Sequence, residues 1–118
     1  MEIVKISSQI LDMNEQLFKM RSEIKNRALQ KSKTIAEYDK ALGKTMLSLR
    51  NGVEMSLDEE TIKDPPTTII EKISKAIVWK ERLAMEEADL LYKSLSTNIE
   101  TVKAQLNGLQ SINRHLDS

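Results

Sequence analysis

The stretch from Thr68 to Leu116 constrains this chain more than any other, because its 49 residues hold no proline and only one glycine. Between Ala76 and Tyr92, 11 of 17 residues are apolar, so hydrophobic side chains point to more than one side of any helix formed there. A helix buried on one face cannot use this pattern, whereas a helix surrounded by other helices can. The stretch therefore predicts a long helix, over about 68–115, inside a bundle.

The first part of the chain predicts a second long helix, over about 2–50. Its main apolar stripe alternates spacings of three and four residues, as in a coiled coil. The stripe consists of Ile3, Ile6, Ile10, Met13, Leu17, Met20 and Ile24. Val4, Leu11 and Phe18 form a second row at intervals of seven, well away from the stripe. This second row either contacts a second neighbour or widens a single core stripe.

Residues 51–67 form the predicted connector between the two helices. Asn51-Gly52 is a turn signal, and Pro65-Pro66 ends any helix before it because proline lacks the backbone amide. The sequence from Ser56 to Glu59 fits a capping box and predicts a short helical turn over about 57–63. The connector carries five acids against one lysine, which suits a solvated loop or a loop with a contact of its own.

Two helices joined by one connector form an antiparallel hairpin, which can bury one stripe from each helix. The additional apolar rows would then face water, and exposed apolar bands mark interfaces. The sequence thus predicts an all-α protein with a single domain over 1–118: a long, coiled-coil-like helical hairpin that assembles into a homo-oligomeric bundle, as a dimer or a higher oligomer. The predicted oligomer interface consists of Ile3, Ile10, Leu17, Phe18, Ile24, Ile69, Ile77, Val78, Leu83, Met85, Leu90 and Tyr92.

Composition and charge exclude several functional classes. The 18 basic and 18 acidic residues cancel, so the chain has no bulk attraction to nucleic acid or membrane. It has no cysteine, which excludes disulfides and zinc–thiolate sites and suits a reducing compartment. No apolar run approaches the roughly 20 residues that cross a bilayer, and the N-terminus lacks a signal-sequence pattern. We therefore expect a cytoplasmic protein that binds no membrane and no cofactor.

The residue types needed for catalysis do not occur together in this sequence. The single histidine, His115, excludes a catalytic triad and a histidine-rich metal site within one chain. The three glycines lie far apart, so no phosphate-binding loop is present. The carboxylate clusters Asp58-Glu59-Glu60 and Glu86-Glu87-Asp89 lack the Glu-x-x-His pairs of a di-metal bundle and suit solvated charge. We expect no catalytic residues, no metal and no enzymatic activity.

A positive band lies in the middle of the first predicted helix, where six basic residues face one acid, Glu23. The band consists of Lys19, Arg21, Lys25, Arg27, Lys31 and Lys33. One interpretation is a docking surface for nucleic acid, a nucleotide or an acidic partner. The other is a solvated face that pairs with the acidic connector of a neighbouring subunit.

Trp79, with Lys80 and Arg82 beside it, forms a second candidate contact cluster. A tryptophan in such an apolar stretch usually belongs to a core, because its large ring gains most from burial. The alternative is that Trp79 forms a stacking wall for a base, in a pocket between subunits.

Three segments resemble small, mostly uncharacterised helical proteins from the early regions of phages and prophages of Gram-positive bacteria. The resemblance covers roughly residues 35–115 and is carried by Glu37 to Leu42 with Leu49-Arg50, by Pro66 to Ile70 with Trp79-Lys80, and by Ala88 to Ser94 with Asn107 to Ile112. It implies an intracellular phage protein made early in infection, close to replication or recombination genes. It brings no catalytic residues.

The chain also resembles, more weakly, the helical-hairpin sponges with which phages sequester cyclic-nucleotide immune signals. The likeness rests on a proline-containing turn before a helix with a tryptophan in it, as in Pro65-Pro66 and Trp79. It implies an oligomer that binds its ligand between subunits.

Three functions remain in view from the sequence. The first is a non-enzymatic, homo-oligomeric protein that binds and modulates a host or phage protein, in host takeover or anti-defence. The second is an oligomeric sponge for a nucleotide immune signal. The third is an accessory of replication or recombination that contacts single-stranded DNA.

Overall fold

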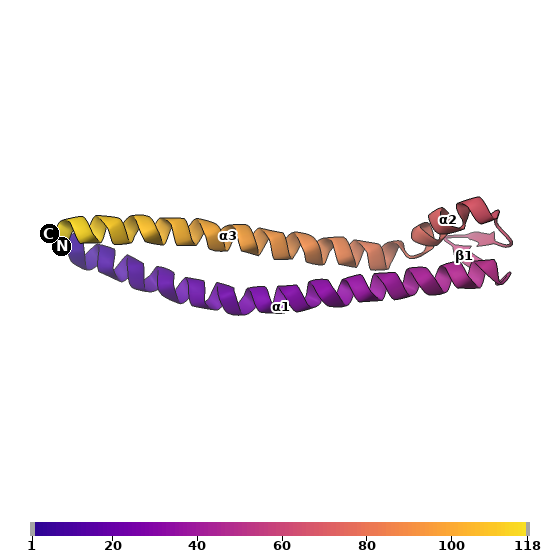
Figure 1. Ribbon diagram of the computed structural model, residues 1–118, viewed down its shortest axis with the longest axis horizontal. Helices are drawn as coiled ribbons and strands as arrows, with labels where there is room; N and C mark the ends of the chain where they lie inside the picture. Colours follow the sequence, from indigo (N-terminus) through magenta and orange to yellow (C-terminus); the bar gives the residue numbers. More distant parts are fainter. Residues whose placement is uncertain (1, 118) are drawn as a thin grey trace. The chain divides into compact units, whose positions relative to one another are not determined.

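The computed structural model describes residues 2–117, so the two ends of the predicted domain 1–118 lie outside the described residues. The chain divides into two compact units, one formed by residues 2–29 and 90–117 and the other by residues 30–89. Figure 1 shows that in each unit a part of the first long helix runs beside a part of the last one. The predicted all-α helical hairpin is confirmed.

Helix α1 spans Glu2–Arg50, in agreement with the helix predicted over about 2–50. It ends in a Schellman motif, the common helix stop in which a residue with positive φ follows the last turn. Gly52 has φ 79 and its amide donates to the Leu49 carbonyl, while the Val53 amide donates to the Ser48 carbonyl. Glycine suits this place because a side chain there would be strained.

The connector forms a β-hairpin, so the predicted helical turn over 57–63 is wrong. Strand β1 (Met55–Leu57) pairs antiparallel with β2 (Glu60–Ile62) through a two-residue loop whose first residue, Asp58, has φ 53. Two-residue hairpin loops require a positive φ at this position, and aspartate tolerates it. Half-buried Met55 and Leu57 alternate with exposed Ser56, and this strand pattern overrides the capping box.

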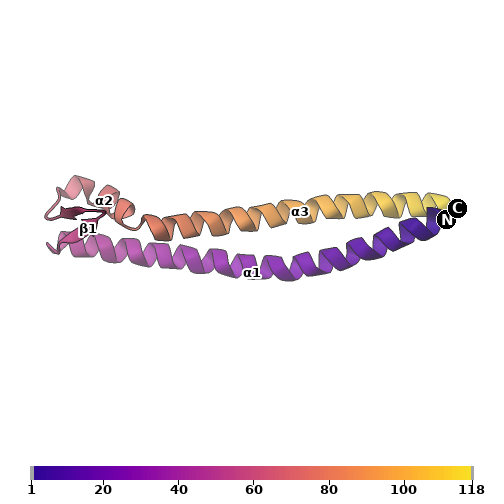
Figure 2. The same ribbon diagram turned by 180° about the vertical axis from the view of Figure 1, so that it is seen from behind.

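The predicted unbroken helix after Pro66 is also wrong. The chain forms a short 3₁₀ helix η1 (Thr67–Ile69), then α2 (Ile70–Ile77), then α3 (Trp79–Asp117). Val78 separates the two α-helices, with φ −93 and ψ 29. Helix α2 contacts η1 and β1, which places it against the β-hairpin, as seen from behind in Figure 2.

A charged residue lies in the heptad row just after this break, and we expect it to favour the break. Ser74, Glu81, Ala88, Leu95 and Val102 follow one another at intervals of seven, and all of them except Glu81 are buried. If α1 stayed packed along this whole row, the carboxylate would be buried, and burial of a charge is costly. Glu81 lies within α3 and is exposed, in a hollow that Lys40 and Lys44 also line.

Each unit has its own core. In the first unit, Leu17 from α1 packs with Leu95, Ile99, Val102 and Leu106 from α3. The partly buried residues packed against this core are Ile10, Met13, Met20 and Ile24. The second unit buries fewer large apolar side chains, and its buried set includes three hydroxyl residues. That set consists of Thr34, Thr45, Leu49, Ile70, Ser74, Val78 and Ala88.

Candidate functional site on the outer face of α1

Four large apolar side chains lie on a face of α1 that turns away from the core of the first unit. Val4, Leu11, Phe18 and Leu29 are 73, 60, 77 and 70% exposed. With 3.6 residues per turn, this outer row lies about 140° around the helix from the buried stripe. The second apolar row therefore does not widen the core, and it leaves an apolar surface uncovered in the single chain.

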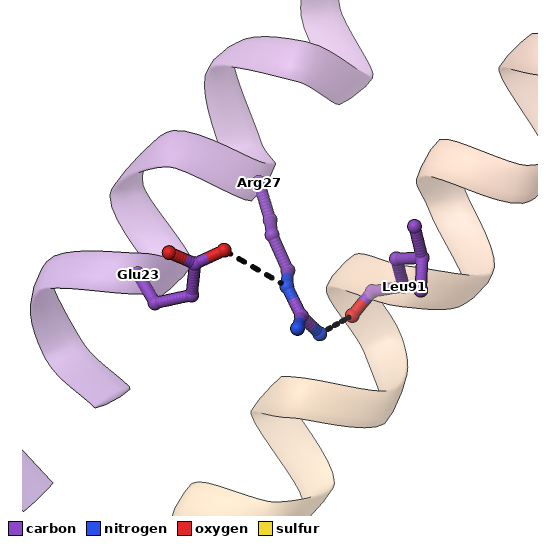
Figure 3. Close-up of polar contacts among 3 residues, drawn as sticks. All are labelled: Glu23, Arg27 and Leu91. Carbon is purple, nitrogen blue, oxygen red and sulfur yellow. Dashed lines mark hydrogen bonds and ion pairs between the residues drawn. The ribbon is translucent and has the colours of Figure 1, made fainter. Parts of the chain in front are cut away.

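The predicted basic band contains two residues that make contacts within the chain and four that are exposed. Arg27 and Lys31 point to the core side of α1 and contact the antiparallel segment of the same chain. The Arg27 Nη1 donates to the Leu91 carbonyl oxygen at 2.8 Å, and its Nε lies 3.4 Å from a carboxylate oxygen of Glu23, as Figure 3 shows. Lys31 pairs with Asp89 at 3.1 Å. Both cations therefore take part in contacts between α1 and the last long helix of the same chain.

The other four basic residues of the band, Lys19, Arg21, Lys25 and Lys33, are exposed. Lys25 occupies the next heptad position after Val4, Leu11 and Phe18, so the outer row changes there from apolar to basic. Cations beside exposed apolar side chains suit a partner that is both apolar and acidic.

A groove of about 270 Å³ lies beside Phe18, between the two helical segments of the first unit. Leu17 and Leu106 contribute apolar walls. Its polar lining consists of Asn14, Arg21, Lys103 and Asn107. Lys103 lies 3.4 Å from a carboxylate oxygen of Glu100, which offsets part of its charge. Two cations, two amides and an exposed ring are a set of groups able to hold a small anion with a planar body.

The Trp79 cluster lies in the second unit. Trp79 begins α3 and is 49% exposed, so it is not a core residue. The Lys80 ammonium lies 5.6 Å from the centroid of its ring, within the range of a cation–π contact. Arg82 pairs with Glu86 at 3.1 Å, one helical turn away. Both predicted cations of this cluster thus have partners within α3.

The predicted oligomer interface contains residues of three kinds. Leu17 and Val78 are buried inside the chain, so their assignment to an interface between chains is corrected: intrachain packing already covers them. The half-buried members are Ile10, Ile24, Ile77, Met85 and Tyr92. The exposed members are Ile3, Phe18, Ile69, Leu83 and Leu90. This exposed group offers the most surface without rearrangement.

The sequence interpretation missed Leu29 as a member of the outer row. Leu29 follows Phe18 by 11 residues and Leu11 by 18, and 18 residues make five full turns of an α-helix. The heptad count skipped Leu29 because a straight helix drifts from a repeat of seven. The lining of the groove by Asn14, Lys103 and Asn107 was missed as well, because it depends on the register between the helices.

Within the described residues, no cluster of three or more potential ligands could hold a metal ion, and no helix is long and apolar enough to span a bilayer. Together, the fold and the outer row define a helical hairpin with an uncovered amphipathic face. Comparison of the chain with protein-family models, curated proteins and solved structures found no match.

Proposed function

We propose that this protein is a non-enzymatic, homo-oligomeric helical binding protein, and that its outer row on α1 is buried between chains. The observation that carries the proposal is the exposure of Val4, Leu11, Phe18 and Leu29 on a face that the chain's own core does not use. Covering apolar surface is worth about 25 cal/mol per Å². A row of such side chains along one face of a helix is therefore a candidate for an interface.

The balance of buried and exposed apolar residues supports the same proposal. Among residues 3–116, ten hydrophobic residues are buried, whereas fifteen large apolar side chains are exposed. Scattered exposed apolar residues are ordinary, but four of these fifteen lie in the outer row on one face of α1. The chain carries more apolar helix surface than its own packing covers.

Copies of the same chain are the first partners proposed for this row, since every single chain leaves its row uncovered. In the setting implied by the phage resemblance, the oligomer acts in the host cytoplasm and binds a host or phage protein, in host takeover or anti-defence. The exposed cations beside the row favour an acidic surface on that second partner.

Replacement of Leu11 and Phe18 by glutamine tests the proposal, because glutamine keeps the helix propensity and removes the apolar surface. Sedimentation velocity at micromolar concentration should show an oligomer for the unchanged chain. The double variant should associate at least tenfold more weakly, a loss of about 1.4 kcal/mol or more.

The matched control is Val53→Thr, which changes an exposed apolar residue of the connector and should leave association unchanged. Circular dichroism should show equal helix content for all three proteins. An unchanged chain that sediments as one folded copy would refute self-association. Capture from infected-cell lysate by both the unchanged chain and the double variant would place the second partner elsewhere on the surface.

A nucleotide sponge is a second candidate, favoured by the groove between Arg21 and Lys103. A ligand present at a hundred times its dissociation constant stabilises a protein by about 2.7 kcal/mol. A panel of cyclic nucleotides should then raise the melting temperature of the unchanged chain, and Lys103→Gln should reduce the rise. The absence of any shift across the panel would remove this candidate. The single-stranded DNA alternative instead predicts binding that falls steeply with salt.

A further inference from the structure

The outer side of α1 in the first unit carries positive charge that the chain does not compensate. Phe18, Arg21, Lys25 and Leu29 lie within about 80° of arc on the helix. Arg21 and Lys25 are one turn apart, where like charges repel, and the described part of the chain contains no ion pair for either of them. We call these four residues the basic patch. Its two cations lie between two exposed apolar side chains.

The groove extends the basic patch toward α3. Phe18 and Arg21 line it from one side, and Lys103 lines it from the other. Because Lys103 has Glu100 close by, the uncompensated charge is concentrated on α1. An occupant of this surface therefore needs at least two negative charges and some apolar surface.

The same chain has a segment with these properties in the other unit. Asp58, Glu59 and Glu60 are three consecutive exposed acids at the turn of the β-hairpin, next to half-buried Leu57. The hairpin register fixes this turn, and the residues from Leu57 to Glu60 line a shallow hollow. The lysine of the connector, Lys63, already pairs with Glu54 at 3.6 Å. Within residues 3–116, no ion pair involves the three acids of the turn.

We propose that the acidic turn of one copy docks on the basic patch of another copy. The acids of the turn pair with Arg21 and Lys25, and the contact partly covers Phe18 and Leu29. Each copy carries both surfaces, so the contact is head-to-tail and repeats into a ring or an open array. The inference rests on the proposed self-association and adds its geometry and its salt dependence, because contacts between exposed charges weaken as salt is added.

Reciprocal charge reversal tests the docking. The patch variant is Arg21→Glu with Lys25→Glu, and the turn variant is Glu59→Lys with Glu60→Lys. Asp58 stays unchanged because its positive φ favours aspartate over lysine. Sedimentation equilibrium should show that each variant alone associates at least tenfold more weakly than the unchanged chain. An equimolar mixture of the two should recover the association, since every contact between unlike copies then joins opposite charges.

The controls are Lys72→Glu on α2 and Glu87→Lys on α3, two exposed residues outside both surfaces, which should not change association. If the patch variant and the turn variant each associated as tightly as the unchanged chain, the docking would be refuted and the proposed self-association would stand. An unchanged chain that stays a single copy would refute both. The docking would also be refuted if the two variants associated no more tightly in the mixture than each does alone. Tight binding of inorganic phosphate at Arg21 and Lys25 without any effect on assembly would refute it as well.

Discussion

Single residues in this structure have roles that their type alone does not reveal. Ser74 is fully buried and its hydroxyl has no hydrogen-bond partner, whereas the Thr34 hydroxyl, also buried, donates to the Gln30 and Lys31 carbonyls at 3.0 Å. An unsatisfied buried hydroxyl costs roughly 1–3 kcal/mol, while a satisfied one costs little. The two residues therefore contribute differently to stability.

We expect Ser74→Ala to stabilise the protein by about 1 kcal/mol, because it removes the unsatisfied oxygen and little volume. Urea unfolding followed by circular dichroism measures the change in the free energy of unfolding. Thr34→Val is the matched control and should give no gain, since it deletes a hydroxyl that has partners. A loss of stability in Ser74→Ala would show that a buried water satisfies the serine.

Substitution of the glycine within α1 and of the glycine just after its end should change the free energy of unfolding in opposite directions. Gly52→Ala places a side chain at φ 79, with its Cβ 3.4 Å from a carboxylate oxygen of Asp64, and should destabilise by roughly 1–2 kcal/mol. Gly43→Ala adds a methyl group with nothing within 4 Å and should stabilise by about 0.5–1 kcal/mol. Thermal unfolding measures both changes. Equal effects would contradict the Schellman assignment at Gly52.

At the scale of elements, the sequence predicted α1 well and the second half less well, for a physical reason. The stripe of α1 repeats over many turns, so small preferences add to a clear signal. The β-hairpin depends on Met55, Leu57 and Ile62 being half-buried, which a local capping pattern cannot reveal. The break at Val78 falls inside an apolar stretch, Ala76 to Trp79, where the sequence holds no proline or glycine to mark it.

The same limit applies to the candidate site. The Val4, Leu11 and Phe18 row was visible as a repeat of seven, but a repeat does not state which of two rows is buried. Only the register between α1 and α3 shows that Leu17 enters the core while Phe18 does not. That register also separates Arg27, which binds the Leu91 carbonyl, from Arg21, which does not enter such a contact.

Replacement of Glu81 by leucine should join α2 to α3. The change puts an apolar side chain at the exposed place in the heptad row and removes the cost of burying a carboxylate there. Amide hydrogen exchange at residues 79–81 should slow by about tenfold or more, equivalent to about 1.4 kcal/mol in opening free energy. Glu87→Leu, an exposed position off the row, is the control and should leave these amides unchanged. Unaltered exchange in Glu81→Leu would assign the break to the burial of Val78 instead.

At the scale of the whole molecule, the two units differ in what they bury. The first unit packs Leu17 against four large apolar residues of α3. The second unit buries three hydroxyl residues among its core positions. Local opening is easiest where few apolar contacts hold an element, so the second unit should open more readily than the first.

Native-state hydrogen exchange checks this expectation directly. Amides of α2 should exchange at a lower opening free energy than amides between residues 95 and 106, by about 1–2 kcal/mol. The Ser74→Ala variant should narrow the difference, because it strengthens only the second unit. Uniform protection across both units would show that the chain opens in one cooperative step.

The half-exposed Trp79 has a practical consequence, since it is the single tryptophan of the chain. Its fluorescence reports on one place only, the junction where α3 begins. A shift of its emission to shorter wavelength on assembly would show that another copy covers the indole. If the emission wavelength stayed the same on assembly, the contact between copies would lie elsewhere on the surface. The fluorescence of Trp79 can thus be compared with the sedimentation data on the same sample.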